Sequence, residues 1–329
     1  MAAMAIATSD SRVKLATDWS RKVLDDPALR LEPISGDASF RRYFRIHPSA
    51  GPTRVLMDAP PEKEDSQPFL EVASRLRAAG LHAPEVLHFD LELGLGVLED
   101  LGDRLYREVI DAEAGSEVVT GLFDVLARMA TDVNAEGLPP YDRRLLQAEL
   151  DLFPGWYLGW HRDRTFDEGE LQCWQRLCDV LIDNAIVQPQ VFVHRDFHSC
   201  NLMWQDGGPP GIIDFQDAVR GPLSYDFISL IWDRYIHWPR SRLEGWMADM
   251  HARLEPEFDL RTWVRHCDLM GLQRNLKVVG IFARLRYRDG KQGYVEMIPM
   301  FWKYLLDVLP RYPEFGPFLA ILEDPACAP

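Results

Sequence analysis

The sequence lacks the features that mark several large classes of protein. It has five cysteines, an odd number, and no C-x-x-C pair, which disfavours disulfides and a cysteine-based metal site and indicates a reducing compartment. No apolar run approaches the roughly 18 residues needed to span a bilayer. The N-terminal stretch MAAMAIATSD has no basic flank and does not read as a signal peptide. We therefore expect a cytoplasmic protein that has no membrane partner.

Clusters of basic residues and internal repeats are missing as well. The formal net charge is −15, and no run of lysine and arginine offers the basic face that a nucleic-acid binder usually shows. The charge balance suits a neutral or cationic ligand, although a bound phosphate needs only local positive charge. We expect no nucleic-acid partner, and no obligate protein partner is evident.

Familiar nucleotide-binding and hydrolase motifs are also absent. The chain has no G-x-x-x-x-G-K-[ST] loop, no G-x-S-x-G elbow and no H-E-x-x-H metal motif. Gly94-x-Gly96 is followed by V-L-E, so the dinucleotide fingerprint fails at its third glycine. Any nucleotide chemistry must rest on another set of residues.

What the chain does have is enough apolar material for two lobes. Hydrophobic residues make up 47% of its 329 residues, and single cores stop growing at roughly 250–300 residues. The first hundred residues predict a small, mostly antiparallel sheet with one inserted helix. The expected elements are a helix over residues 9–26, strands over 39–46 and 53–57, a helix over 68–79, and strands within 83–93 and over 95–99.

Long helical patterns dominate after Gly102. We place the lobe boundary in the extended segment V-L-E-D-L-G, residues 97–102, which gives an N-terminal lobe over residues 1–100 and a C-terminal lobe over 101–329. The pattern predicts the α+β class. The expected helices cover residues 118–134, 144–160, 170–185, 225–235, 242–254 and 262–286, and they are interrupted once by a β-rich stretch over 191–215.

That β-rich stretch carries the most informative residues. It reads V-F-V-H-R-D-F-H-S-C-N-L-M-W, with Asp196 in the loop after a strand and Asn201 five positions later. Asp214 follows in the apolar setting G-I-I-D-F-Q-D. Phosphoryl transfer needs a carboxylate to take the acceptor proton and divalent metal to neutralise phosphate charge. The H-R-D-x-x-x-x-N spacing, followed by an Asp, therefore predicts Asp196 as the catalytic base and Asn201 and Asp214 as Mg²⁺ ligands.

Simpler interpretations stand beside this one. A polar turn between two strands would place Asp196 and Asn201 as partners of main-chain groups. His198 would help to bind the transferring phosphate, or it would be a packed loop histidine bonded to the main chain.

At these residues the sequence resembles the aminoglycoside phosphotransferase/choline kinase family, from about Ser35 to about Leu309. The family implies a bilobal protein-kinase-like fold with a small β-rich N-lobe that binds nucleotide and a large, mostly helical C-lobe that carries catalysis and substrate. Further stretches, G-D-A-S-F-R-R-Y-F-R-I, V-L-M-D-A-P-P-E and L-E-D-L-G-D, are similar to the bacterial anomeric amino-sugar kinases of cell-wall recycling. The resemblance implies ATP-dependent phosphorylation of N-acetylmuramic acid and N-acetylglucosamine at the C1 hydroxyl.

The resemblance also implies roles for residues outside the H-R-D stretch. The family's hinge, whose main chain bonds adenine, matches Glu99, Asp100 and Leu101. Asp226, in S-Y-D-F, matches an aspartate that braces the catalytic loop, although an N-terminal helix carboxylate is the simpler role. The nucleotide loop, which would cover phosphates with main-chain N–H groups, matches Ser35, Gly36, Asp37, Ala38, Ser39 and Phe40.

One departure from the family pattern concerns a lysine. Such kinases place a lysine on the third strand, paired with a helix glutamate, whereas this strand reads V-L-M-D with Met57 near that position. Glu71 is a plausible counterpart of the glutamate, and Arg42 or Arg45 would reach the phosphates instead of a lysine. Either arginine would equally suit an exposed strand. The gap leaves a non-catalytic binding module as an alternative.

The acceptor would lie between the catalytic loop and the helical lobe. Expected contacts are Asp233, Arg234 and Tyr235 after one helix, and Arg274 and Lys277 in Q-R-N-L-K. An arginine would grip the lactyl carboxylate of muramic acid, whereas solvated helix faces are the simpler interpretation of such charges. An alternative acceptor is another small alcohol: an aminoglycoside, choline, homoserine or a thiosugar.

Overall fold

The computed structural model describes residues 11–34, 40–110, 115–233 and 235–329. The chain divides into two compact units, one formed by Met1–Leu105 with Leu202–Asp217 and the other by Tyr106–Asn201 with Ala218–Pro329. The predicted boundary at residues 97–102 places residues 202–217 in the C-terminal lobe. In the structure, residues 202–217 make their contacts with the first unit and belong to it. The first unit contains an antiparallel sheet and the second is mostly helical, so the predicted α+β class is confirmed.

The sheet of the first unit has five antiparallel strands in the order β1-β2-β3-β5-β4. The strands predicted at residues 39–46, 53–57, 83–93 and 95–99 are present. The edge strand β1 was not predicted, because its sequence R-L-E-P-I carries a proline, which only an edge strand tolerates well. The strands are β1 Arg30–Ile34, β2 Arg42–His47, β3 Arg54–Asp58, β4 Val86–Asp90 and β5 Leu95–Glu99.

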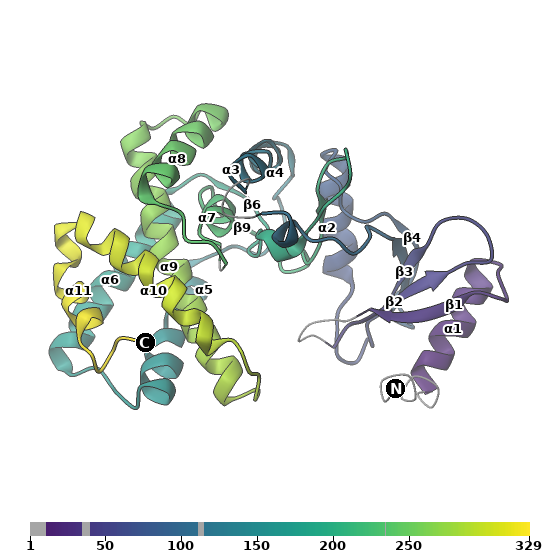
Figure 1. The fold of residues 1–329 in the computed structure, drawn as a ribbon, viewed down its shortest axis with the longest axis horizontal. Coiled ribbons are helices and arrows are strands. Elements are labelled where there is room, and N and C mark those ends of the chain that lie inside the picture. Colours follow the sequence, from purple (N-terminus) through teal and green to yellow (C-terminus); the bar gives the residue numbers. More distant parts are fainter. Residues whose placement is uncertain (1–10, 35–39, 111–114, 234) are drawn as a thin grey trace. The chain divides into compact units, whose positions relative to one another are not determined.

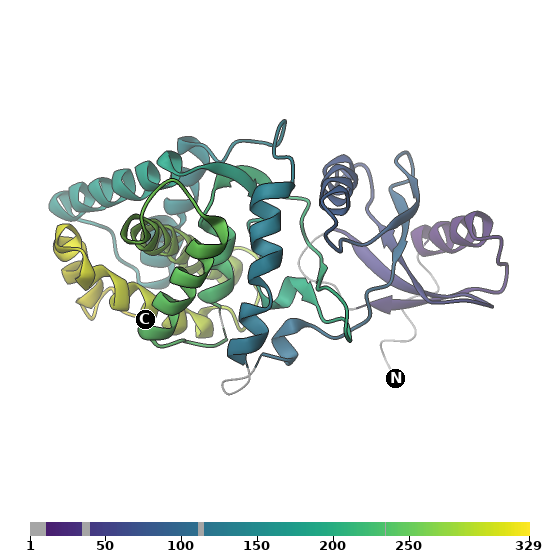
Figure 2. The ribbon, with the colours of Figure 1, turned by 90° about the horizontal axis from the view of Figure 1, so that it is seen from above.

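Two helices lie on opposite sides of this sheet, α1 (Ser11–Val23) and α2 (Gln67–Ala78), as Figure 1 and Figure 2 show. Ala16 of α1 packs in one core cluster with Phe44 and Leu56, which face each other across β2 and β3. Side chains alternate between the faces of a strand. The neighbouring cross-strand pair, Tyr43 and Met57, therefore belongs to the face away from α1.

A short hairpin completes the first unit. Strands β7 (Leu202–Met203) and β8 (Gly211–Ile212) pair with each other, and Gly211 also bridges to His82. A Cβ on Gly211 would lie 2.8 Å from the Leu101 side chain, so this glycine permits the hairpin to pack against the 97–102 segment. Phe215, just after the hairpin, stacks on Phe69 of α2 with ring centroids 5.1 Å apart. These contacts hold the segment that carries Asp214 on the first unit.

The second unit is built around one long buried helix, α9. Helices were predicted in most of the observed places, but residues 118–134 and 144–160 each break into two helices, and α10 and α11 were not predicted. The helices are α3 Gly115–Thr120, α4 Phe123–Asp132, α5 Arg143–Leu150, the π-helix η2 Phe153–His161, α6 Glu168–Val187, α7 Tyr225–Ile231, α8 Arg240–Leu254, α9 Leu260–Tyr287, α10 Ile298–Val308 and α11 Gly316–Glu323.

Shorter elements connect these helices. Strand β6 (Gln190–Val193) pairs with β9 (Val219–Pro222) and leads into the segment with the H-R-D pattern. No helix in the described ranges is both long enough and apolar enough to cross a membrane. The 3-10 turns are η1 Tyr106–Glu108, η3 Ser199–Asn201, η4 Val295–Met297, η5 Leu309–Arg311 and η6 Pro313–Phe315.

A glycine sets how closely α9 approaches the chain between α5 and η2. A Cβ on Gly280 would lie 2.4 Å from the main-chain carbon of Leu152, a contact that only movement of the backbone relieves. We expect Gly280→Ala to lower the free energy of unfolding by about 1–3 kcal/mol, as overpacking does. Urea unfolding measures the change. Gly245→Ala in α8 is the control, because its Cβ would meet no atom within 4 Å and should stabilise the helix slightly. Equal stability of the two variants would contradict this packing account.

Candidate active site

The loop after β6 is fixed by a single carboxylate from another element. The main-chain N–H groups of His194 and Arg195 donate to the Asp226 carboxylate at 2.6 and 3.0 Å. Arg195 has a left-handed backbone conformation with φ of 75°, which is uncommon for a residue with a side chain. Asp226, in the first turn of α7, therefore holds a sharp turn directly before Asp196.

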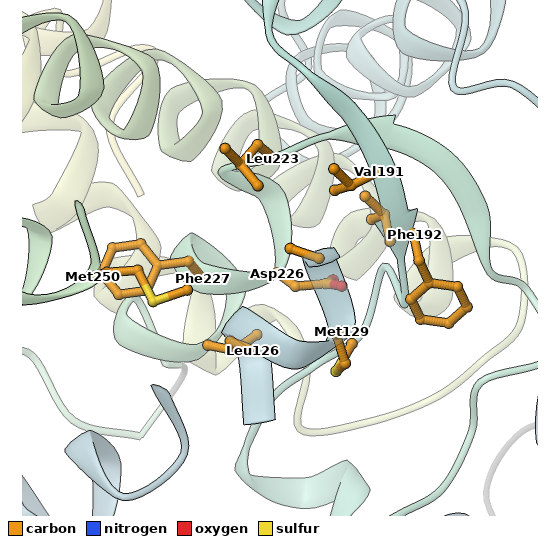
Figure 3. A pocket seen from close by; sticks show the side chains of 10 residues that line it. Leu126, Met129, Val191, Phe192, Leu223, Asp226, Phe227 and Met250 are labelled. Atoms are coloured by element: carbon orange, nitrogen blue, oxygen red, sulfur yellow. The ribbon is translucent and has the colours of Figure 1, made fainter. Parts of the chain in front are cut away.

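Asp226 does this from an apolar setting. Figure 3 shows it in a pocket lined by Leu126, Val191, Phe227 and other apolar side chains. Burial is the largest influence and raises its pKa to about 6, although the charge of His194 and the two main-chain hydrogen bonds act in the opposite direction.

This raised pKa predicts a pH dependence of stability. The folded-state value of about 6 lies above the ordinary 3.8, so ionisation of Asp226 costs the folded protein stability. The contribution is fully present below about pH 4 and is lost as pH rises through about 6. Asp226→Asn has no such ionisation. We expect the unfolding free energy of wild type to fall relative to that of the variant between pH 4 and 7 in urea titrations. Parallel pH profiles for the two proteins would refute this.

Asp196 and Asn201 meet within the loop. The Asn201 side-chain nitrogen donates to the main-chain oxygen of Asp196 at 3.0 Å, and the main-chain N–H of His198 donates to the same oxygen at 3.0 Å. The amide of Asn201 thus uses its nitrogen within the loop, whereas a divalent cation would bind the oxygen. The predicted spacing of five residues therefore closes a compact turn.

The Asp196 carboxylate is exposed and surrounded by positive charge. Burial among the neighbouring atoms would raise its pKa, but the charges of Lys277, His198 and Arg274 lower it to about 2. The structure thus brings together, in the second unit, two stretches that are far apart in the sequence, one with Asp196 and His198 and the other with Arg274 and Lys277. Asp196 is ionised throughout the neutral range, which is the form that accepts a proton.

A buried ionic cluster lies behind the loop. The Oε1 atom of Glu149, in α5, forms ion pairs with the Arg195 guanidinium at 2.6 Å and with the Lys277 ammonium at 2.9 Å. Tyr141 and Gln273 both donate to its other oxygen. Burial alone would raise the pKa of Glu149, but Lys277 and Arg195 bring it below its ordinary value. The H-R-D arginine is therefore tied to the helical core rather than to the reaction.

The acceptor candidates of the second unit fall into two groups. Asp233 is buried and bonded within the unit, because it accepts from the Ser199 hydroxyl at 2.5 Å and from the Tyr235 N–H at 3.0 Å. Arg274 is 5% exposed, and its Nη1 atom has no hydrogen-bond partner in the described part of the chain. A buried donor without a partner is costly, so Arg274 suits a ligand better than Asp233 does. Arg234 lies outside the described residues.

Asp214 has its own geometry in the first unit. It is exposed, its backbone is left-handed with φ of 63°, and its Oδ1 atom accepts from the Gln216 amide at 2.9 Å. Phe215 is fully buried against Phe69. The described residues contain no group of three His, Cys, Asp or Glu side chains that would enclose a metal. Asp214 in the first unit and Asn201 in the second each carry a side-chain oxygen, the type of ligand that Mg²⁺ takes together with phosphate and water.

The predicted hinge is tied to the sheet and the hairpin. Glu99 accepts from His82 at 3.0 Å, and Asp100 accepts from Arg45 at 2.7 Å. The Leu101 main-chain oxygen accepts from the Gln205 amide at 2.7 Å. These side-chain contacts hold the main chain of the segment in one conformation.

The remaining residues predicted to bind nucleotide differ in their exposure and in their partners. Phe40 is 61% exposed, and the Lys63 ammonium lies 5.0 Å from its ring centre. Arg42 bonds to the buried Asp58 at 2.7 Å. Glu71 pairs with Arg75 one turn along α2 at 2.6 Å, so this ion pair lies within the helix. Ser35, Gly36, Asp37, Ala38 and Ser39 lie outside the described residues.

Sequence reasoning missed two charged groups near these sites. One is Glu149 with its two cations, and the other is Arg41, which pairs with Glu64 at 3.2 Å. The signal for Arg41 was the R-R pair at the start of β2, because neighbouring residues point to opposite faces of a strand. Nothing in the local sequence pairs Glu149 with residues 46 and 128 positions away.

The arrangement in the two units defines a kinase-like fold. An ethanolamine kinase from Plasmodium vivax has the same fold, with a TM-score of 0.65 over 91% of this chain and 89% of that one, at 9% identity. A model of the phosphotransferase enzyme family matches residues 30–269, so the chain belongs to that family. The predicted resemblance, fold and phosphotransferase activity are confirmed.

Two bacterial relatives are much more similar in sequence. An N-acetylmuramate/N-acetylglucosamine kinase from Pseudomonas putida is 40% identical over 322 residues, covering 93% of this chain and 94% of its own length. A protein with the same name from Pseudomonas aeruginosa is 41% identical over 308 residues, covering 91% of this chain and 90% of its own length. The similarity therefore includes both units.

Proposed function

We propose that the protein is a cytoplasmic, ATP- and Mg²⁺-dependent kinase that phosphorylates the C1 hydroxyl of N-acetylmuramic acid and N-acetylglucosamine in peptidoglycan recycling. The observation that carries the proposal is the shared name of relatives at 40% identity over 93% of the chain. The reactive residues of the second unit support it, because an ionised Asp196 lies among positive charges.

Asp196 is the proposed base. An anomeric hydroxyl is more acidic than an ordinary alcohol, and the transition state of phosphoryl transfer is loose, so little basicity is required. A carboxylate with a pKa of about 2 is therefore adequate, because its main task is to orient the hydroxyl and take its proton late. Asp226 and the Glu149 cluster position the loop on which Asp196 lies.

The remaining roles concern nucleotide and metal. Asn201 and Asp214 would hold Mg²⁺ through their oxygen atoms, and the bound ion would neutralise charge on the phosphates. The main chain of Glu99, Asp100 and Leu101 would bond adenine. The segment from Ser35 to Phe40 would cover the phosphates with its N–H groups.

An acceptor panel tests the proposed function. Release of ADP is measured with Mg²⁺ and ATP against N-acetylmuramic acid, N-acetylglucosamine, an aminoglycoside, choline, homoserine and methylthioribose. We expect rapid turnover with the two amino sugars alone. Turnover confined to any other acceptor would contradict the proposal, and ATP binding without transfer to any acceptor would favour a binding module.

Arg274 is the proposed partner of the lactyl carboxylate, and His198 and Asp233 would lie beside the sugar with Arg234. The burial of Arg274 and its unpartnered Nη1 support this role. We expect Arg274→Gln to lower kcat/KM for N-acetylmuramic acid at least about tenfold, the value of a lost charged hydrogen bond. The value for neutral N-acetylglucosamine should change little.

A substrate variant makes this prediction specific. The carboxamide of N-acetylmuramic acid has the same shape without the charge. Wild type should therefore have a higher kcat/KM for the acid than for the carboxamide, whereas Arg274→Gln should have similar values for the two. Arg261→Gln, exposed at the start of the same helix, is the matched control. Equal losses with both sugars in Arg274→Gln would show that Arg274 does not recognise the carboxylate.

A further inference from the structure

The two faces of the sheet separate the arginines of β2. Arg42 and Asp58 are opposite each other in the register of β2 and β3, and Arg12 of α1 joins them, with its Nε atom 2.8 Å from Asp58. Asp58 is fully buried by this arrangement. The Arg42 side chain therefore lies on the side of the sheet that faces α1. The face on which Met57 stands in place of a lysine is the other one.

Arg41 lies on that other side. It precedes β2 by one residue, is two positions from Tyr43 and is 9% exposed. Tyr43 is the cross-strand neighbour of Met57. The Arg41 Nη2 atom is 3.2 Å from a carboxylate oxygen of Glu64. An ion pair of the buried Arg41 with the half-buried Glu64 thus lies beside the position at which a strand lysine is missing.

Two further observations relate this pair to Asp214, which belongs to the same unit. Glu64 precedes α2, and Phe69 in the first turns of α2 stacks on Phe215 at 5.1 Å, so the residue after Asp214 packs on this helix. The side chain of Tyr43 is close enough to Arg41 and to Asp214 for the charge of each to change its pKa. Burial raises its pKa to about 12, the charge of Arg41 lowers it, and the charge of Asp214 raises it.

We propose that Arg41, oriented by Glu64, contacts the phosphates of the nucleotide in the role that a strand lysine and its helix glutamate fill elsewhere. The proposal rests on the proposed function, because Asp214 marks the phosphate end of the site. An arginine suits the task, since its planar fork of five N–H donors bonds a carboxylate on one edge and a phosphate on another. Glu64 limits the side chain to the conformation that reaches the phosphates.

Nucleotide binding without any acceptor tests this role. The affinities of the full-length protein for ATP and for adenosine are measured by calorimetry for wild type, Arg41→Met, Arg41→Lys and Glu64→Gln. We expect Arg41→Met to weaken ATP binding at least about tenfold and to leave adenosine binding unchanged. Arg41→Lys should retain part of the ATP affinity. Glu64→Gln should weaken ATP binding less than Arg41→Met does.

The outcomes separate this proposal from a purely structural ion pair. Equal weakening of ATP and adenosine binding, or no change in either, would overturn it. Arg30→Met, an exposed substitution on the edge strand of the same sheet, is the control. If Arg41→Met does not fold, the same comparison of ATP with adenosine in Arg41→Lys and Glu64→Gln decides the question. Amino-sugar turnover with normal ATP binding in Arg41→Met would overturn this inference alone, and an Arg41-dependent ATP affinity without sugar turnover would overturn the proposed function alone.

Discussion

Replacement of Asp196 by asparagine should lower kcat for amino-sugar phosphorylation by about 10²–10⁴-fold, the usual contribution of a general base. The substitution keeps the size of the side chain and removes the charge that accepts the proton. ATP affinity should stay within about a factor of two, because Asp196 is assigned to the acceptor and not to the nucleotide. The change is measured as ADP release under saturating substrate, with ATP binding titrated separately.

Two comparisons make the Asp196 result interpretable. Asp206→Asn, at a side chain that is 93% exposed in the β7–β8 hairpin, should leave turnover unchanged. Urea unfolding of Asp196→Asn should show a lower stability than wild type at neutral pH, because the positive charges that lower the pKa of Asp196 to about 2 stabilise its ionised form in the folded protein. The variant should still unfold in one cooperative transition. Turnover of Asp196→Asn near that of wild type would remove Asp196 from the role of base.

Replacement of Lys277 by methionine should cost about 3–5 kcal/mol of unfolding free energy, the usual penalty when one partner of a buried ion pair is removed. Glu149 would keep only Arg195 as a cation, and Tyr225 would lose the ammonium that bonds it at 3.0 Å. Burial raises the pKa of Asp196, whereas the charge of Lys277 is the largest of the influences that lower it. The acid limb of the kcat profile should therefore move to higher pH in the variant.

The double variant Glu149→Gln with Lys277→Met tests the pairing itself. It should recover part of the stability that Lys277→Met loses, because the buried carboxylate charge is removed together with its partner. Lys303→Met, exposed on α10, is the matched control and should change stability by less than about 0.5 kcal/mol. Additive losses in the double variant, with an unmoved pH profile, would show that the cluster does not act as described.

The catalytic loop was the part of the site most accessible to prediction from sequence. Asp196 and Asn201 are separated by five positions in one stretch, and their relation depends on a local turn that the main chain closes with short hydrogen bonds. The strands with alternating patterns were predictable for the same reason. Each of these features needs only neighbouring residues, and the local pattern agrees with the final fold.

Other features depend on contacts between distant segments. Glu149, Arg195 and Lys277 come from three elements, and their burial as a group follows only from the packing of α9. Asp233 is predicted from the sequence as an acceptor contact, and the hydrogen bonds that its carboxylate accepts from Ser199 and from main chain are not indicated by the sequence. No local pattern distinguishes a charge that faces a ligand from one that braces a loop.

Missed or displaced elements have local physical causes. The helix predicted over residues 144–160 breaks near Leu152, because Pro154 enters η2 and the turn continues as a π-helix. Helix α10 is mostly apolar and starts with I-P-M-F-W, and its polar side is marked by two charged residues one turn apart, Lys303 and Asp307. Tertiary burial, which the periodicity does not report, stabilises it.

The position of the transferred phosphate shows whether the C1 hydroxyl is the acceptor. The protein is incubated with ATP, Mg²⁺ and either N-acetylglucosamine or its 1-O-methyl glycoside, which has every hydroxyl except the one at C1. The account predicts that only the free sugar is phosphorylated and that its product is stable to alkali and labile to acid, as a 1-phosphate is. Phosphorylation of the methyl glycoside, or an acid-stable product from the free sugar, would contradict it.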